Sequence, residues 1–203
     1  MLHFEAISPG TLDLLISLCA HPALDGFALA GGTALALRFG HRISIDLDFF
    51  SPGDFDSRSF ARRLGETLQF APAALHENSL SGTVADVKVD FVTCHHALLQ
   101  PLEIIDGIRL FGLRDNIAMK LSELTNRGAK KDFFDAHRVI QELGIDEIVD
   151  IYRAKFPAHD GAILLRSLVY FDDAEDEFDP DSLDGTEWEQ VKKAVTQAVR
   201  SLL

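Results

Sequence analysis

The 203-residue chain has few cysteines and no long hydrophobic runs. Cys19 and Cys94 are its only cysteines, and each lies in an apolar or strand-like stretch, which favours two buried thiols over a disulfide framework or a zinc site. The apolar runs are too short to cross a bilayer. The first nine residues include Glu5 and lack the basic and apolar regions of a signal peptide. We therefore expect a cytoplasmic protein with no membrane partner.

Basic residues are also scarce, with 19 Lys and Arg against 32 Asp and Glu and a net charge of −13. The segment 172–187 contains nine carboxylates and no Lys or Arg, so the rest of the chain carries a net charge of only −4. A strongly acidic chain disfavours a polyanionic partner, but the nearly balanced body holds a basic cluster that could contact phosphates. This cluster comprises Arg127, Lys130, Lys131 and Arg138. We interpret residues 172–184 as an extended linker, and the whole segment 172–187 as a solvated face or a protein-contact surface without a catalytic role.

The apolar periodicity predicts mixed strands and helices in the first half of the chain and helices alone in the second. In the first half we expect helices over 8–20, 34–38 and 55–68, and strands over 27–30, 43–50, 75–80, 83–93 and 108–111, with a hairpin turn at Ser81-Gly82. In the second half we expect helices over 115–126, 131–143, 146–155, 159–170 and 186–203. The sequence thus predicts an α+β fold with an α/β core over 1–112 and a helical region over 113–203.

Two aspartates, Asp46 and Asp48, stand two residues apart in the predicted strand 43–50. Alternation along a strand places both on one face, about 6.6 Å apart. Carboxylates together with substrate phosphates bind Mg²⁺, and a pair of Mg²⁺ ions activates an attacking oxygen while neutralising a departing pyrophosphate. Asp90, on a similarly amphipathic strand, is the first candidate for a third carboxylate, with Asp86 in reserve. The alternative is a solvated strand face on which Asp90 pairs with Lys88.

Gly31, Gly32 and Thr33 separate a predicted strand from a predicted helix. Such a turn can present backbone N–H groups and a helix N-terminus to a triphosphate. Neither a Gly-Gly turn nor an Asp-x-Asp pair is specific alone. The glycine turn, followed thirteen residues after Thr33 by Asp46 and then by a later strand aspartate, is a specific pattern.

Two blocks of the sequence resemble the AbiEii/AbiGii nucleotidyltransferase toxin family. They are residues 29–51, LAGGTALALRFGHRISIDLDFFS, and residues 113–140, LRDNIAMKLSELTNRGAKKDFFDAHRVI. The resemblance implies a polymerase-beta-like nucleotidyltransferase core with a mixed sheet, followed by a helical C-terminal region that completes the active-site cleft. One departure is Gly-Thr where the family often has Gly-Ser, which retains the hydroxyl group.

The resemblance also implies roles for individual residues. Gly32 and Thr33 would lie near the triphosphate, and Asp46 and Asp48 would bind the metal. Lys120 would correspond to a lysine that contacts nucleotide phosphate, and Asp132 or Asp135 would take the final acidic position of the family.

Several of these residues have other interpretations. Lys120 could be a solvated helix lysine, Asp132 a helix N-cap, and Asp135 a charge that complements the helix dipole. The pair His41-Arg42 could position a phosphate or bind a carboxylate structurally. We interpret His95 and His96 as loop residues, because no further metal ligands accompany them.

The expected activity is transfer of a nucleoside monophosphate from an NTP to an acceptor hydroxyl. By resemblance the acceptor is an RNA, such as a tRNA 3′ end, and a separately encoded antitoxin is the expected protein partner. The alternatives are a small-molecule acceptor such as an antibiotic, a protein side chain, or a nucleotide-binding module without catalysis. The intact Asp-x-Asp pair argues against the last of these. A haloacid-dehalogenase-like phosphatase is disfavoured because it normally has Thr where this chain has Phe50.

Overall fold

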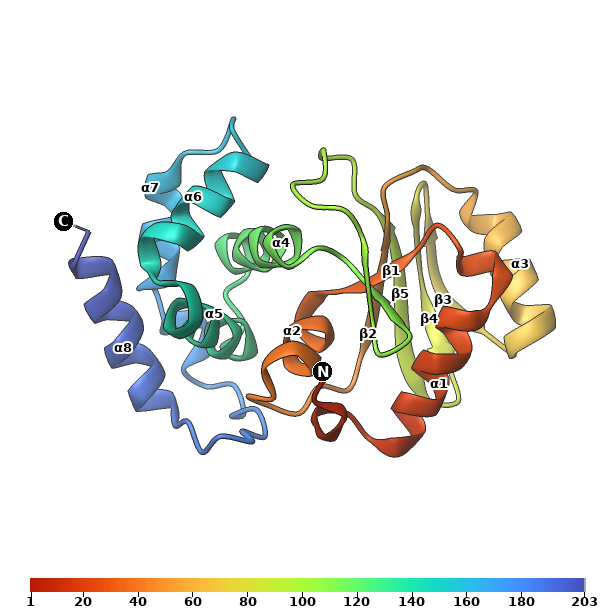
Figure 1. The fold of residues 1–203 in the computed structure, drawn as a ribbon, viewed down its shortest axis with the longest axis horizontal. Helices are drawn as coiled ribbons and strands as arrows, with labels where there is room; N and C mark the ends of the chain where they lie inside the picture. The colour runs from red at the N-terminus through yellow and green to blue at the C-terminus, as the bar shows by residue number, and fades with distance from the viewer. Residues whose placement is uncertain (203) are drawn as a thin grey trace.

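A seven-stranded mixed sheet forms one part of the molecule and a group of helices forms the other (Figure 1). The computed structural model describes residues 1–202. The expected α+β class is confirmed. No helix among these residues is long and apolar enough to cross a membrane.

The sheet has the strand order β3-β4-β5-β2-β1-β7-β6. Its strands are β1 (Ala28–Ala30), β2 (Leu47–Ser51), β3 (Ala71–His76), β4 (Ser79–Val84), β5 (Val87–Thr93), β6 (Glu103–Ile105) and β7 (Ile108–Leu110). Strand β2 runs parallel to β5 and antiparallel to β1. In this register Asp48 lies beside Asp90 on one side and beside Ala30 on the other.

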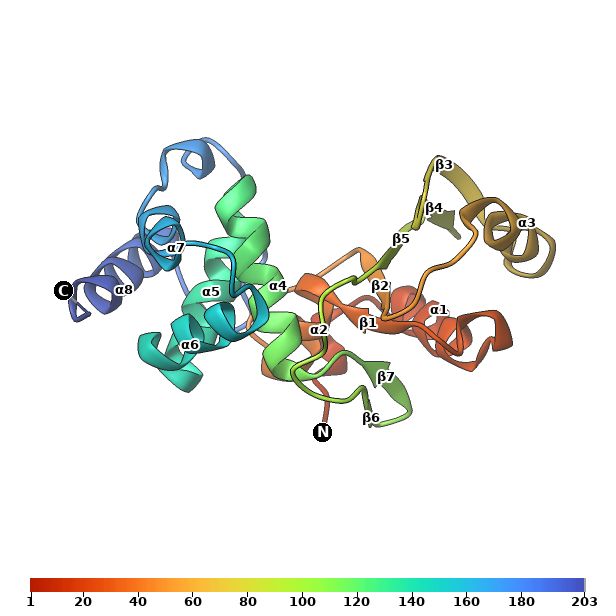
Figure 2. The same cartoon turned by 90° about the horizontal axis from the view of Figure 1, so that it is seen from above.

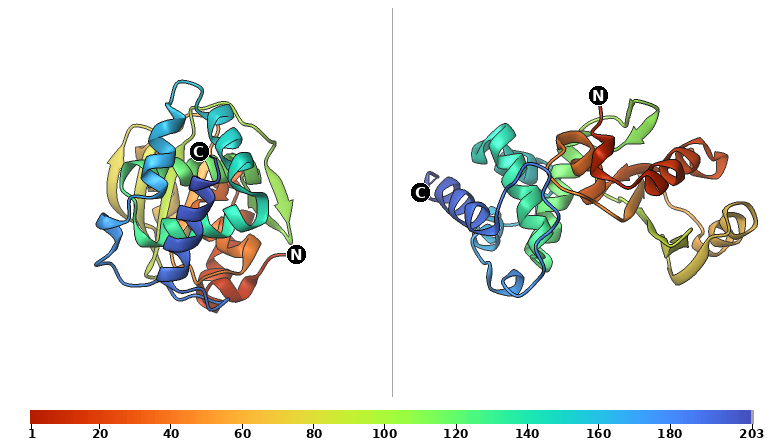
Figure 3. Two further views of the ribbon diagram at one scale, coloured as in Figure 1. Left: turned by 90° about the vertical axis from the view of Figure 1, so that its left-hand side faces the viewer. Right: turned by 90° about the horizontal axis from the view of Figure 1, so that it is seen from below.

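Some helices lie beside the sheet, and the others form a group to one side of it (Figures 1 and 2). They are α1 (Pro9–Ala20), α2 (Gly31–Phe39), α3 (Ser57–Leu68), α4 (Leu113–Asn126), α5 (Lys130–Leu143), α6 (Ile145–Lys155), α7 (Gly161–Leu168) and α8 (Trp188–Arg200), with short 3-10 turns at Phe4–Ala6, Pro22–Leu24 and Asp172–Ala174. Helices α1 and α3 lie with the sheet, and α4 to α8 form the helical part, with α8 on its outer side (Figure 3).

Two hydrophobic cores stabilise these two parts. Beside the sheet, Phe27 stacks on Phe60, and Phe60 meets Phe91 edge to face, each with ring centroids 5.0 Å apart. In the helical part, Phe133 packs edge to face on Trp188. Helix α2 contributes Leu37 to the first core and Leu35 to the second. This short helix therefore joins the two parts through apolar burial on both of its faces.

The predicted hairpin turn at Ser81-Gly82 is wrong. The chain turns instead at Glu77-Asn78 and at Ala85-Asp86, where Asn78, Ala85 and Asp86 take positive φ values. Gly82 lies inside β4. A Cβ atom at this position would sit 2.3 Å from Phe70 Cζ. This glycine permits close packing and does not mark a turn.

The predicted strand over 43–50 is also corrected, since β2 begins only at Leu47. The backbone N–H of Ile43 donates to Asp181 O, and that of Ser44 donates to Ala6 O, so neither joins the sheet ladder. Ile45, expected on the buried face, is 70% exposed. Strand β6 was not predicted.

The helices agree with the sequence within a few residues, and the side chain of Asp56 caps the N-terminus of α3. Helix α8 covers 188–200 of the predicted 186–203, and residue 203 lies outside the described residues. The acidic segment is not a free linker, because the buried Lys130 Nζ donates to Glu175 O at 3.2 Å and to Asp179 Oδ1 at 2.9 Å.

A buried ion pair fixes the connection between β5 and β6 against the helices. Lys155 Nζ lies 2.6 Å from Asp115 Oδ1, and both side chains are fully buried. Lys155 also donates to Ala97 O at 2.9 Å, and Asp115 accepts from the backbone N–H groups of Leu99 and Gln100. Every charge in this cluster therefore has hydrogen-bond partners, as burial requires.

Replacing Lys155 with Met should lower the free energy of unfolding by about 3–5 kcal/mol, because Asp115 would remain buried without its countercharge. The double variant Lys155→Met, Asp115→Asn should recover part of this loss. Urea denaturation followed by circular dichroism measures both values. Lys193→Met, at an exposed position of α8, is the control and should change stability by less than about 0.5 kcal/mol. An equal effect of Lys155→Met and Lys193→Met would contradict the prediction.

Candidate active site

A cavity of about 350 Å³ lies between the edge of β2 and β5 and the corner where α4 meets α5. Its wall carries charges of both signs. The lining residues are Gly32, Arg42, Ser44, Asp46, Asp48, Phe50, Lys88, Asp90, Val92, Lys120, Glu123, Asn126, Arg127 and Lys131.

Three carboxylates form the sheet side of the cavity, which we call the acidic edge: Asp46, Asp48 and Asp90. Asp46 immediately precedes β2, Asp48 lies in β2, and Asp90 lies beside Asp48 in β5. Asp90 Oδ2 accepts a hydrogen bond from Lys88 Nζ at 2.6 Å. Asp90 Oδ1 is buried and has no hydrogen-bond partner in the described part of the chain. The structure therefore brings together all three carboxylates that the sequence predicted.

Two cations reach the acidic edge, Lys88 at Asp90 and Lys131 at Asp46, but neither pairs with Asp48 among residues 1–202. Burial, reinforced by the nearby Glu123 carboxylate, raises the pKa of Asp48 to about 6, and Lys120 offsets only part of this shift. Within residues 1–202 no three His, Cys, Asp or Glu side chains stand close enough together to hold a metal ion by themselves. Mg²⁺, however, is usually bound by one or two carboxylates together with substrate phosphates and water. Asp48 and Asp90 lie side by side, and Asp90 has an unpaired buried oxygen, so this pair fits such a cation.

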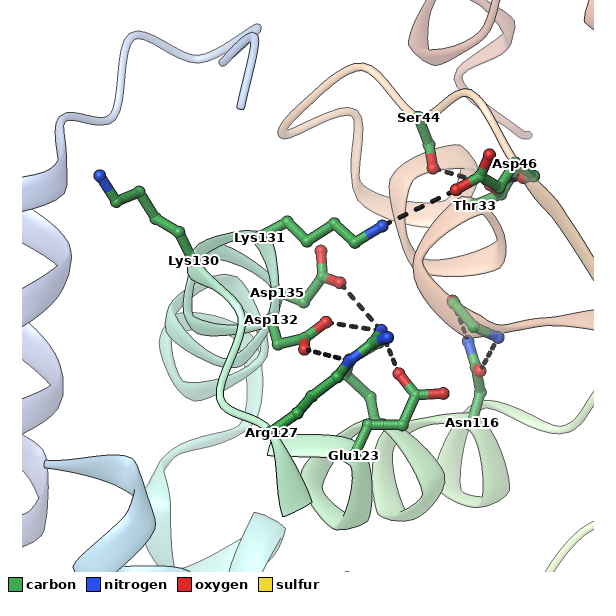
Figure 4. Close-up of polar contacts among 12 residues, drawn as sticks. Thr33, Ser44, Asp46, Asn116, Glu123, Arg127, Lys130, Lys131, Asp132 and Asp135 are labelled. Atoms are coloured by element: carbon green, nitrogen blue, oxygen red, sulfur yellow. Dashed lines mark hydrogen bonds and ion pairs between the residues drawn. The ribbon is translucent and has the colours of Figure 1, made fainter. Parts of the chain in front are cut away.

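The glycine turn packs against Asp48 of the acidic edge. Gly31 has a φ of +67°, and a Cβ atom there would sit 2.6 Å from Asp48 Oδ2, so glycine is required for Asp48 to approach the turn. The N–H of Gly31 donates to Asn116 Oδ1 at 2.7 Å, and Asn116 Nδ2 donates to Gly31 O (Figure 4). Gly32, in the first turn of α2, lines the cavity.

Thr33 does not line the cavity. Its hydroxyl group bonds to Ser44 Oγ at 2.7 Å and donates to the backbone carbonyl of Asp46. Of the three residues expected at the triphosphate, Gly32 alone faces the cavity among the described lining residues, and Thr33 holds the segment that carries Asp46.

Lys120 on α4 is buried, so the alternative of a solvated helix lysine is wrong. Its Nζ donates to Glu123 Oε2 at 2.6 Å and to Asp132 Oδ1 at 3.0 Å, and lies 3.7 Å from Asp135 Oδ2 (Figure 4). Burial alone would lower the pKa of Lys120, but these carboxylates outweigh it and raise the pKa above its ordinary value. The ammonium group is thus charged and already bound to carboxylates where it borders the cavity.

Asp132 and Asp135 on α5 are fully buried and do not line the cavity. Asp132 is the third residue of α5, whose N-cap is Ala129, so the N-cap interpretation of Asp132 is wrong. Both carboxylates face Lys120 from outside the cavity wall.

Asp135 is held by residues from the segment between α2 and β2, which we call the Asp135 clamp. Arg42 donates from Nε to Asp135 Oδ1 at 2.7 Å and from Nη2 to Asp135 Oδ2 at 2.8 Å, and His41 Nε2 lies 2.8 Å from Oδ1. Burial would raise the pKa of Asp135, but Arg42, His41 and Lys120 together hold the pKa well below its ordinary value. The structural interpretation of Arg42, binding a carboxylate, is therefore confirmed.

Three residues weighed from the sequence lie outside the cavity wall. Asp86 is exposed in the turn before β5. His95 is 67% exposed and lies 3.6 Å from Asp54, while His96 packs on Phe156. Ser44 and Asn116 were not singled out from the sequence, because their contacts depend on partners 11 and 85 residues away.

Comparison with known proteins gives consistent matches over most of the chain. The family model described as "Nucleotidyl transferase AbiEii toxin, Type IV TA system" matches residues 13–201. The protein named "Uncharacterized protein aq_aa25" from Aquifex aeolicus (strain VF5) is 33% identical over 185 residues, which cover 88% of this chain and 89% of that protein.

Two solved structures share the fold. A putative nucleotidyltransferase from H. pylori has a TM-score of 0.59 at 17% identity, covering 96% of this chain and 95% of the other. MenT4, the nucleotidyltransferase toxin Rv2826c from Mycobacterium tuberculosis H37Rv, has a TM-score of 0.56 at 16% identity, covering 90% of this chain and 78% of the other.

The Asp135 clamp predicts a specific dependence of stability on pH. Because the folded-state pKa of Asp135 is depressed, its stabilising contribution is present above its unfolded-state pKa, near 3.8, and is lost as the pH falls below that value. Asp135→Asn should remove this contribution and leave Arg42 buried without a countercharge, at a cost of about 3–5 kcal/mol at pH 7.

Urea denaturation between pH 7 and pH 3 checks both statements. The Asp135→Asn protein should lose stability less steeply than the wild type as the pH falls below 4. Asp86→Asn, at an exposed turn, is the matched control and should leave the pH profile unchanged. If the free energy of unfolding varied with pH in parallel for the wild type and Asp135→Asn, the clamp would not lower the pKa of Asp135.

Proposed function

Because this chain belongs to the AbiEii nucleotidyltransferase toxin family, we propose that it transfers a nucleoside monophosphate from an NTP to a hydroxyl group of an RNA, with Mg²⁺ bound at the acidic edge. The family confirms the expected enzyme class, a nucleotidyltransferase, and the solved structures share its polymerase-beta-like fold. The metal, the acceptor and the individual residue roles are our proposal.

One observation carries the proposal: the acidic edge faces basic side chains across a single cavity. Asp46, Asp48 and Asp90 line the sheet side, and Arg127 and Lys131 line the helical side. A divalent cation needs the first set, and a triphosphate needs cations and a helix N-terminus. Gly32, at the start of α2, borders the same cavity.

The reaction would join the acceptor oxygen to the α-phosphorus of the NTP. The bond from that phosphorus to the oxygen bridging the β-phosphate would break, and pyrophosphate would leave. Bound Mg²⁺, as one ion or as the two we expect, would supply positive charge at the phosphate oxygens and lower the pKa of the acceptor hydroxyl.

The residues of the chain have separate roles in this proposal. Asp46 and Asp48 hold the cation, and Asp90 either completes its binding or takes the hydroxyl proton. Asp90 Oδ1 suits the proton because it is unpaired, whereas Oδ2 is bound to Lys88. Gly32 at the start of α2 and the charge of Lys120 orient the triphosphate, with Gly31 and Thr33 fixing the turn.

Asp132 and Asp135 would act through Lys120, by holding its ammonium group at the cavity wall. The proposed division places the nucleotidyltransferase core at 1–112 and a helical region at 113–203 that supplies this wall. The proposed setting is the cytoplasm, where NTPs and RNA are both available.

We propose RNA, with a tRNA 3′ end as the specific case, because the family is one of toxins. The toxin-antitoxin description of the family also supports a cognate antitoxin protein as a partner. Small molecules and protein side chains could use the same donor site, so the acceptor requires its own test.

Asp46→Asn and Asp48→Asn should each reduce Mg²⁺-dependent label transfer from an NTP on the order of 10³-fold, because each removes a negative charge from the acidic edge. Transfer of label from an NTP carrying ³²P at the α-phosphate measures the effect. Asp86→Asn removes an aspartate outside the cavity and should retain wild-type activity. Full activity of Asp46→Asn would exclude the proposed metal site.

The acceptor can be identified by incubating the protein, Mg²⁺ and labelled NTPs with total cell extract. Label should appear in RNA and disappear on ribonuclease treatment, and the Asp46→Asn protein should give no labelled product. Label resistant to ribonuclease but sensitive to protease would identify a protein acceptor instead. Label confined to small solutes would identify a small molecule.

A further inference from the structure

Lys131 is the second residue of α5, and it borders the cavity from the helical side. Its Nζ reaches across to Asp46 Oδ2, 3.8 Å away (Figure 4). The two side chains are partly open to solvent, with exposures of 44% for Lys131 and 28% for Asp46. The contact is therefore too long for a hydrogen bond and is weakened by solvent screening.

The deeper cations of the site are bound firmly by comparison. Arg42 donates two hydrogen bonds to Asp135, and Lys120 donates to Glu123 and Asp132. Moving either cation would leave a buried carboxylate without its countercharge. Within residues 1–202, Lys131 has no ion pair besides that with Asp46. Lys131 can therefore change partner at little cost.

Lys88 and Arg127 are less suited to this role. Lys88 is bound to Asp90 at hydrogen-bond distance and lies on the sheet side of the cavity. Arg127 faces Asp132, at 3.7 Å, and does not pair with the acidic edge in the described residues. Lys131 is thus the loosely held cation that spans from the helical wall to a carboxylate proposed to bind the metal.

A divalent cation at Asp46 and the ammonium group of Lys131 would compete for the same negative charge. Once the cation binds, Asp46 no longer attracts Lys131, and the triphosphate brings several negative charges to the helical side. We propose that Lys131 is the countercharge of Asp46 in the free protein and moves to the nucleotide phosphates when the metal and the NTP bind. This inference rests on the proposed function of the site.

The proposal predicts effects of opposite sign in the variant Lys131→Met. The variant should bind Mn²⁺, used as a paramagnetic probe in place of Mg²⁺, about threefold more tightly, because a competing positive charge is removed. It should bind inorganic triphosphate in the presence of Mg²⁺ about tenfold more weakly, because a charged phosphate contact is lost. Neither measurement depends on catalysis or on the preferred base.

Free Mn²⁺ is measured by electron paramagnetic resonance, and triphosphate binding by isothermal titration calorimetry. Lys131→Arg keeps the charge and should restore both affinities to near the wild-type values. Lys193→Met, at an exposed position of α8, should change neither affinity.

If Lys131 had only a structural role, Lys131→Met would bind both Mn²⁺ and triphosphate more weakly. If Lys131 had no role at the site, neither affinity would change. Each of these results overturns the proposed exchange of partners by Lys131. A change in only one affinity overturns it as well. Comparing Mn²⁺ binding by the wild type and by Asp46→Asn distinguishes a failure of the Lys131 proposal from a failure of the proposed function. If they bind Mn²⁺ equally, the metal site itself is wrong. If Asp46→Asn loses Mn²⁺ while Lys131→Met binds as the wild type does, the site stands and the exchange is excluded.

Discussion

The arrangement of the cavity depends on one buried carboxylate, Asp135. Its two oxygens take the guanidinium fork of Arg42, and His41 adds a third contact. An isolated carboxylate at this depth would be strongly unfavourable, so α5 can pack here only if the segment between α2 and β2 brings its cations to it. The same segment continues directly to Asp46. The clamp therefore fixes the distance between the helical wall and the acidic edge.

The charges of the site fall into two groups by depth. The buried ones, Arg42, Lys120 and Asp135, are paired with one another or with neighbours and set the geometry. Asp46 and Lys131, which lie nearer the solvent, face each other across a longer distance of 3.8 Å. This division has a physical reason: a buried pair is costly to break, whereas a partly exposed pair can exchange one partner for a ligand. A site that must bind both a cation and a polyanion needs charges of the second kind.

Local patterns in the sequence predicted the parts of the fold that local interactions determine. The strand, glycine turn and helix around Gly31 and the helices after Leu113 follow from apolar periodicity and backbone preference. The hairpin turn was misplaced because Gly82 serves a close contact with Phe70, which no local rule reveals. The prediction that the strand begins before Leu47 was wrong for a similar reason, because backbone N–H groups in that segment donate to residues distant in sequence. The three carboxylates were found by their alternation, whereas the clamp joins residues 93 apart.

The two sequence blocks that carry the family resemblance meet face to face in the structure. Gly31 bonds to Asn116, Arg42 to Asp135, and Asp46 faces Lys131, so each of these contacts joins the first block to the second. The residues of each block are therefore held by the opposite block as well as by contacts within their own block. The first block supplies two of the three carboxylates and the glycine turn, and the second supplies the cations Lys120, Arg127 and Lys131. A chain ending at residue 112 would keep the acidic edge and lose these cations. The proposed boundary after residue 112 divides the sequence, whereas residues from both sides of it line the cavity.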